Sequence, residues 1–133
     1  YRPERSRDAA EYSIEDHPHL VDGEMRELFG AFRKEVLALD PCVDEQFKKQ
    51  YVAYKAETNF ADLVPQARRL ILTLNMDFAD ITDPKGICRD VTGLGRWGNG
   101  DVEVTFRSFE ELPYILGLVR QSFERQMGNG GQP

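Results

Sequence analysis

The segment Arg69–Asn75 constrains the fold most, because its residues from Leu70 to Leu74 are apolar in near-unbroken succession. A strand with one face in water alternates apolar and polar residues, whereas a strand covered on both faces is apolar on successive residues. We therefore expect this segment to be a central strand of a β-sheet, with other elements packed on both of its sides.

Other segments of the middle of the chain also have strand patterns. They are short, rich in β-forming residues and bounded by turn residues, which is typical of strands joined by tight connections. The predicted strands are 51–56 and 60–64, joined as a hairpin by a turn at 57–59, then 87–92, and finally 101–106, which alternates and so has one face in solvent.

Helical spacing flanks this strand-rich region. Apolar residues from Met25 to Leu39 recur at helical intervals, and the dipeptide Asp40-Pro41 ends that helix. Asp40 can also cap a short second helix that begins at Pro41 and runs through residues 43–47. A capping box at 108–111 starts the last helix, which carries an apolar stripe as far as Met127.

The order is therefore helix, short helix, about five strands and helix. This order predicts an α+β fold, with a mainly antiparallel sheet of about five strands and the N- and C-terminal helices packed on one face. A length of 133 residues fits one core. We expect a polar leader or linker at 1–22, a single domain at 23–127 and a flexible tail at 128–133.

The charge balance limits the classes of partner. The chain has 17 Lys and Arg against 23 Asp and Glu, a net charge of −6, which argues against a protein that coats nucleic acid by bulk charge. Residues 48–107, however, carry nine basic and eight acidic side chains. This region can hold a local anion site or simply present a neutral solvated surface. No apolar run is long enough to cross a bilayer, so no membrane partner is expected.

Metal and cofactor sites find little support. The only Cys and His residues are Cys42, Cys88, His17 and His19, whose spacing does not fit a zinc site. We expect both cysteines to be buried structural thiols in a reducing cytoplasm, and we expect no cofactor.

A catalytic set is also not evident. Both histidines fall in the polar leader, which disfavours either as a buried general base. Asp101 and Glu103 lie on one face of a predicted strand with Asp90 nearby, but Thr105 stands where a magnesium-dependent nuclease would need a lysine. A small metal-dependent hydrolase is therefore the weakest of the functional interpretations.

Candidate binding residues surround the glycine-rich segment 93–101. Its glycines allow a close approach to a ligand, Arg96 supplies charge and Trp97 a stacking face. Alternatively, Asn99-Gly100 forms a tight hairpin turn and Trp97 folds back on the core. If Lys55, Arg68, Arg89 and Arg96 converge on one face, they form a phosphate-sized basic site. A structural ion pair of Arg89 with a neighbouring carboxylate is the alternative.

An ordered set of motifs between about Leu28 and Arg125 resembles a known family. The motifs are Tyr51-Val52-Ala53-Tyr54-Lys55, Asn59-Phe60-Ala61-Asp62-Leu63-Val64, Arg69-Leu70-Ile71-Leu72-Thr73-Leu74, Asp83-Pro84-Lys85-Gly86, Arg89-Asp90-Val91 and Gly95-Arg96-Trp97-Gly98-Asn99-Gly100-Asp101. In this order they resemble the uncharacterised domain labelled "predicted transport protein". That domain often forms the C-terminal part of ParB-like, GmrSD-type restriction nucleases. The family pattern has His where Arg96 stands.

The resemblance implies a non-catalytic accessory domain of a restriction or defence protein, with the leader as the linker to a front half. The main hypothesis is a module that binds nucleic acid or another domain of its parent protein. The alternative is a structural module for homodimerisation or interdomain docking. The tentative ligand-binding residues are Lys55, Arg68, Arg89, Arg96, Trp97 and Asn99.

Overall fold

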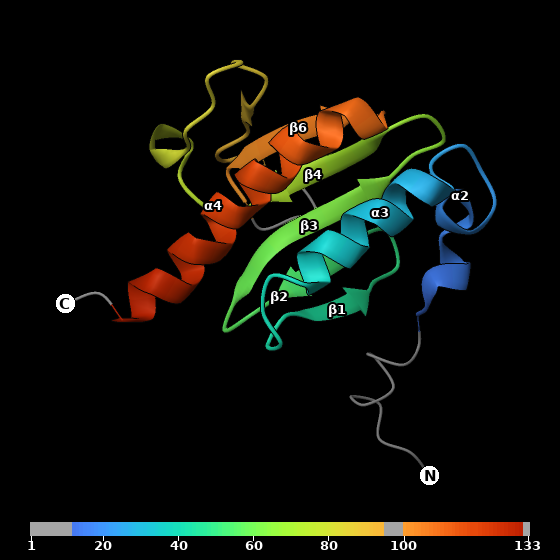
Figure 1. Ribbon diagram of the computed structural model, residues 1–133, viewed down its shortest axis with the longest axis horizontal. Helices are drawn as coiled ribbons and strands as arrows, with labels where there is room; N and C mark the ends of the chain where they lie inside the picture. The colour runs from blue at the N-terminus through green and yellow to red at the C-terminus, as the bar shows by residue number, and fades with distance from the viewer. Residues whose placement is uncertain (1–11, 95–99, 132–133) are drawn as a thin grey trace, which may run out of the picture.

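The computed structural model describes residues 12–94 and 100–131, and it confirms the α+β class. Its centre is a six-stranded antiparallel sheet in the order β1-β2-β3-β4-β6-β5, one strand more than expected (Figure 1). The strands are β1 (Asp44–Phe47), β2 (Val52–Lys55), β3 (Asn59–Pro65), β4 (Leu70–Leu74), β5 (Arg89–Asp90) and β6 (Val102–Phe106).

The strand order confirms the predicted positions of the hairpin and of the central strand. β2 and β3 form an antiparallel hairpin in which Val52 pairs with Leu63. β4 lies between β3 and β6, with Leu72 opposite both Leu63 and Val104. Because all neighbouring strands run antiparallel, short connections suffice and the sheet is built largely as a meander.

The prediction of a short second helix through residues 43–47 is wrong, because Asp44–Phe47 forms edge strand β1. A helix of four or five residues has little stability of its own. As a strand the segment gains a full ladder with β2, from Asp44 opposite Lys55 to Phe47 opposite Val52. The connection turns at once, with the amide of Lys48 donating to the carbonyl of Tyr51 at 2.8 Å.

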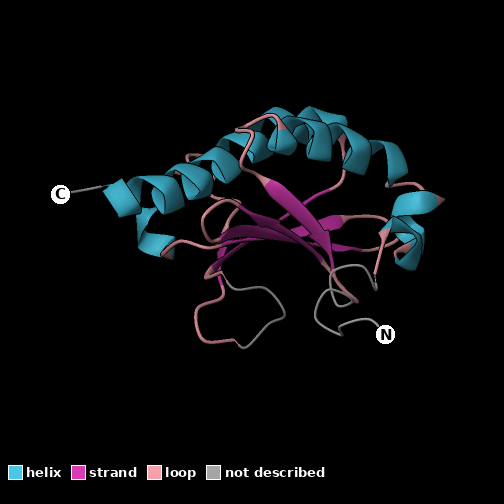
Figure 2. Ribbon diagram, turned by 90° about the horizontal axis from the view of Figure 1, so that it is seen from below, coloured by secondary structure: helices cyan, strands magenta, loops and turns pink. Residues whose placement is uncertain are grey.

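Two long helices, α3 (Arg26–Leu37) and α4 (Leu112–Gly131), cover one face of the sheet (Figure 2). Both were predicted, although α4 continues past Met127 into the expected tail. A 3₁₀ turn, η3 (Phe109–Glu111), leads into α4. There the Glu111 carboxylate accepts the amide of Ser108 at 3.0 Å, which is one half of the predicted capping box.

The hydrophobic core fills the space between these helices and the sheet. Phe32 of α3 is fully buried, with its ring centroid 5.8 Å from that of Tyr54 on β2 and 5.5 Å from that of Phe106 on β6. From α4, the Phe123 ring packs edge-on against Phe60 at 5.3 Å. Burying one such large side chain contributes about 1.5–3 kcal/mol, so this layer is the main stabilising feature of the fold.

Part of the predicted leader is folded onto the domain. Residues of this stretch form a 3₁₀ turn, η1 (Ile14–Asp16), and the short helix α2 (Pro18–Val21). Leu20 is 1% exposed and belongs to the core. His17 is also buried, contrary to the expectation for the leader histidines, with Nε2 2.7 Å from the carbonyl oxygen of Lys48. A hydrogen bond to a carbonyl requires the Nε2–H tautomer as donor, so this histidine ties the leader to the β1–β2 turn.

The other face of the sheet carries no helix in the described residues, and we call it the open face (Figure 2). The expectation that other elements pack on both sides of β4 is met by helices on one side; on the open face no helix of the described residues covers the strand, although Thr73 there is buried. Leu70, Leu72 and Leu74 point to the helices, whereas Ile71 is only partly buried on the open face. The apolar run concealed this difference because Ile71 and Thr73 alternate with the core leucines on the opposite side of the strand.

A candidate binding groove on the open face

A row of mainly polar side chains crosses the open face at one level of the sheet. Strand register alone places them side by side, since each residue pairs with the next. From β2 to β5 the row runs Ala53, Asp62, Thr73, Glu103 and Arg89. Asp62 is 1% exposed and Glu103 7%. Buried carboxylates need hydrogen bonds or ion pairs to compensate for lost hydration, so the neighbours of these two acids determine what this face can bind.

Each buried acid has a defined partner in the described residues. Asn59 Nδ2 donates to Asp62 Oδ1 at 2.9 Å, which ties the start of β3 to its middle. Arg89 Nη1 donates to Glu103 Oε1 at 2.9 Å, across the β5–β6 pair. The Glu103 side chain is 9% exposed, whereas that of Arg89 is 60% exposed. Glu103 therefore anchors a guanidinium most of which still faces solvent.

The predicted structural ion pair thus exists, but its acid is Glu103. Asp90, the sequence neighbour of Arg89, instead accepts the Thr92 amide at 3.0 Å and the Thr92 hydroxyl at 2.6 Å. These hydrogen bonds from Thr92 lower the pKa of the Asp90 carboxyl. Asp90 caps a turn and does not share a site with Glu103.

Arg69 is held in a similar way at the other end of the open face. Its Nε donates to Gln66 Oε1 at 2.7 Å, and the Gln66 amide donates to the Arg69 carbonyl at 3.0 Å, closing the β3–β4 hairpin. With Nε occupied, the two terminal nitrogens of the guanidinium remain as donors for a ligand.

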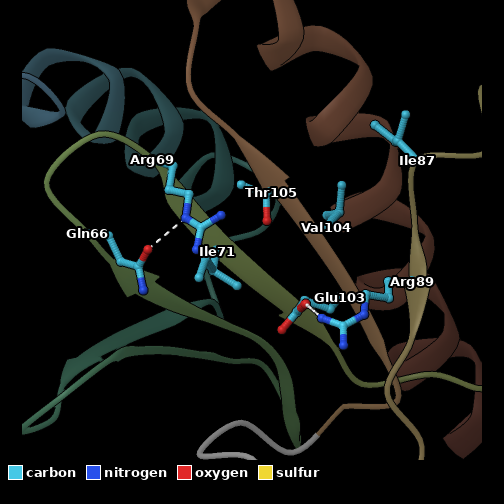
Figure 3. Close-up of a pocket in the computed structure, with 8 residues that line it drawn as sticks. All are labelled: Gln66, Arg69, Ile71, Ile87, Arg89, Glu103, Val104 and Thr105. Carbon is cyan, nitrogen blue, oxygen red and sulfur yellow. Dashed lines mark hydrogen bonds and ion pairs between the residues drawn. The ribbon is translucent and has the colours of Figure 1, made fainter.

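Arg69 and Arg89 lie on opposite sides of one depression, which we call the Arg69–Arg89 groove (Figure 3). Its volume is about 370 Å³. Aliphatic and hydroxyl side chains lie between the two arginines. The lining residues are Gln66, Arg69, Ile71, Ile87, Arg89, Glu103, Val104 and Thr105.

Two more arginines flank the Arg69 end of this groove. Leu70 pairs with Phe106, so the residues one step further, Arg69 and Arg107, lie next to each other at the end of the sheet. Arg68 occupies the exposed tip of the β3–β4 hairpin. Within the described part of the chain, no salt bridge involves Arg68, Arg69 or Arg107. This end of the sheet is therefore locally cationic despite the net charge of −6.

The structure brings together only some of the predicted site residues. Arg68 lies at the cationic end and Arg89 in the groove. Lys55 lies at the opposite end of the sheet, where it pairs with Asp44. Arg96, Trp97 and Asn99 fall outside the described residues.

Arg69, Arg107 and Gln66 were missed as site residues. They follow the strand alternation that places Ile71 and Thr105 on the open face, so the sequence does contain a signal for them. That signal can be recognised only when the register between the strands is known.

The described residues offer no cluster of three metal-ligating side chains. Asp101 lies beside a separate depression with Asp77 and Asp80, and Glu103 is engaged by Arg89. The two cysteines differ from the expectation in part, since Cys42 is exposed and Cys88 is half-buried. Of the helices in 12–94 and 100–131, none is both long and apolar enough to span a membrane.

Comparison with known proteins places the chain in a family. An uncharacterized protein of Haemophilus influenzae is 34% identical over 112 residues, which are 83% of this chain and 37% of that protein. The chain thus spans little more than a third of this relative's length. No solved structure matches the chain by its sequence of 133 residues. Residues 15–126, which include α2, α3 and all six strands, match the model of a domain of unknown function, DUF5655. The chain therefore belongs to the DUF5655 family.

Proposed function

We propose that this domain is a non-catalytic accessory module that binds nucleic acid through the Arg69–Arg89 groove and the cationic end beside it. The observation that carries the proposal is the placement of two oriented guanidinium groups on one groove of a sheet face that no helix in the described part of the chain covers. Each is held by a neighbour, Gln66 for Arg69 and Glu103 for Arg89.

Guanidinium groups held in this way suit phosphate. Their donors form a planar fork that matches two phosphate oxygens, and prior orientation reduces the entropy lost on binding. Arg68 and Arg107 add positive charge at the same end without a competing carboxylate among the described salt bridges. A phosphate backbone is the ligand whose charge and geometry use all of these features.

An accessory role in a larger protein fits the length of the relative. Because the chain spans 37% of the Haemophilus protein, catalytic groups can reside in the remainder of such a protein. In this proposal the parent is a cytoplasmic nuclease of the restriction or defence type, as the family resemblance implies. The domain would help such an enzyme hold nucleic acid.

A docking or homodimerisation module is the second candidate. It is favoured by exposed apolar side chains, among them Phe109 and Leu94, each 53% exposed. Light scattering on the purified chain at 1–200 μM distinguishes the two. A concentration-dependent dimer that Phe109→Ser disrupts supports docking, whereas a monomer across this range contradicts homodimerisation.

Fluorescence anisotropy with labelled DNA and RNA, single- and double-stranded, tests the nucleic-acid proposal. We expect binding at low salt that weakens as salt increases. Arg69→Ala and Arg107→Ala should each weaken it and reduce the salt slope by about 0.7–0.9, the value for one lost phosphate contact.

Arg120→Ala is the matched control, because it removes the same charge from an exposed site on α4, on the helix side of the molecule. It should leave the affinity nearly unchanged. No binding to any strand at low salt, where electrostatic attraction is strongest, would refute the proposal.

A further inference from the structure

We infer that the Arg69–Arg89 groove accepts one unpaired nucleotide of a single strand, with phosphates at the two arginines and a base between them. This inference rests on the proposed nucleic-acid binding and specifies its ligand. It depends on what lies between the arginines, on how far apart they are and on the size of the groove.

The section between the arginines combines polar side chains with the apolar surface of two isoleucines, Ile71 and Ile87. Ile71 of β4 and Thr105 of β6 are paired residues on the open face, and both are partly buried. Ile87, which precedes β5, is 41% exposed at the rim (Figure 3). Aliphatic side chains offer a base a surface for van der Waals contact and provide nothing for a second phosphate.

The separation of the arginine backbones favours a ligand longer than one small anion. Arg69 precedes Thr73 by four residues, and Thr73 pairs with Glu103, the partner of Arg89. Four residues along a strand and two strand spacings across give roughly 13 Å by 10 Å between the backbone positions. A ligand that contacts both needs two anionic groups joined by a neutral section. Consecutive phosphates of a nucleic-acid strand, joined by a sugar that carries a base, have this composition.

The size of the groove favours a single strand over a duplex. A volume of about 370 Å³ lies within the range of pockets that hold one small organic molecule. A base can enter such a pocket only if it is unpaired and unstacked, as in single-stranded recognition. A duplex keeps its bases inside and could reach only the arginines at the rim.

Anisotropy with three labelled 12-mers tests this inference. One is single-stranded DNA, the second has the same backbone with abasic sites throughout, and the third is a blunt duplex. We expect the abasic strand and the duplex to bind at least tenfold more weakly than the intact single strand.

Ile87→Ser tests the base contact directly, and its exposed position makes misfolding a small risk. It should weaken binding of the intact strand by about five- to tenfold, the effect of losing one to two methylene groups of apolar contact, and leave binding of the abasic strand unchanged. Phe109→Ser, an equally exposed apolar residue outside the groove, is the control and should change neither.

The outcomes separate failure of this inference from failure of the proposed function. Equal affinity for intact and abasic strands, or tighter binding of the duplex, would overturn the unpaired-base assignment and leave nucleic-acid binding standing. No binding of any 12-mer would overturn both. A free nucleoside 3′,5′-bisphosphate has the same chemistry as one nucleotide of the strand. If it competed with the labelled 12-mer at an equal affinity, the ligand of the groove would be a free nucleotide, and the assignment to a strand would be overturned.

Discussion

Replacing Tyr54 with Phe removes one hydroxyl from a three-residue polar cluster on the helix-covered face. The Tyr54 side chain is fully buried, and its hydroxyl donates to Glu45 Oε2 at 2.8 Å. The same carboxylate accepts Arg33 Nε at 3.0 Å and a second hydrogen bond from Arg33 Nη2. This cluster connects α3 to the first two strands, so its energy contributes to the docking of the helix.

The magnitude follows from which groups remain satisfied. A hydrogen bond to a charged acceptor contributes about 1.5–3 kcal/mol, and in Tyr54→Phe the carboxylate keeps Arg33 as a donor. We therefore expect a loss of about 1.5 kcal/mol in the free energy of unfolding. Glu45→Ala leaves the buried Tyr54 hydroxyl without its acceptor and removes the ion pair. Because the Arg33 side chain is 38% exposed and can rehydrate, we expect a loss of about 3 kcal/mol, at the low end for a broken buried pair.

Urea unfolding followed by circular dichroism measures both losses, with an unchanged m-value as the check on two-state behaviour. Arg26→Ala is the control, since its ion pair with Glu27 is exposed on both sides and should contribute less than about 0.5 kcal/mol. The reasoning from which hydrogen-bonding groups keep a partner would be refuted by either of two results. One is a free energy of unfolding of Tyr54→Phe within about 0.3 kcal/mol of the parent's, and the other is a larger loss in Tyr54→Phe than in Glu45→Ala.

Three further predictions concern single groups. Burial raises the pKa of Tyr54 well above 10, so the unfolded chain releases this proton at lower pH than the folded one and the parent should lose stability from about pH 10 upward. Tyr54→Phe should lack this loss when urea unfolding is measured between pH 8 and 11, and an equal dependence of stability on pH in the two proteins would contradict the prediction. Burial raises the pKa of the Cys88 thiol to about 12, and a hydrogen bond with Asp40 raises the pKa of Cys42, but Cys42 is exposed. A thiol reagent at pH 8 should therefore label Cys42 faster than Cys88, and rapid labelling that survives in Cys42→Ser would contradict this. A Cβ on Gly100 would lie 2.0 Å from a carbonyl oxygen of β4, so Gly100→Ala should destabilise by about 1–3 kcal/mol. Gly117→Ala, on α4 with open space around it, should stabilise by up to about 1 kcal/mol, and equal effects of the two glycine variants would contradict the packing argument.

Local patterns in the sequence determined the elements that form through neighbouring residues. The capping box at Ser108, the apolar stripe of α3 and the β2–β3 hairpin all act within a few residues or one turn, so propensity and periodicity were sufficient to find them. The α+β class followed from their order. In contrast, β1 is polar except for Phe47, has no strand pattern of its own and becomes a strand because it can pair with β2.

Tertiary structure alone decided which side chains meet. Arg68 and Lys55 are both basic strand-end residues in the sequence, and only the register shows that they lie at opposite ends of the sheet. Arg107 reaches Arg69 through the pairing of β4 with β6, and Glu103 reaches Arg89, 14 residues away in the sequence, through the pairing of β5 with β6. Side-chain alternation fixes each strand's two faces, but the alignment between strands depends on the packing of the whole core, which no local segment encodes.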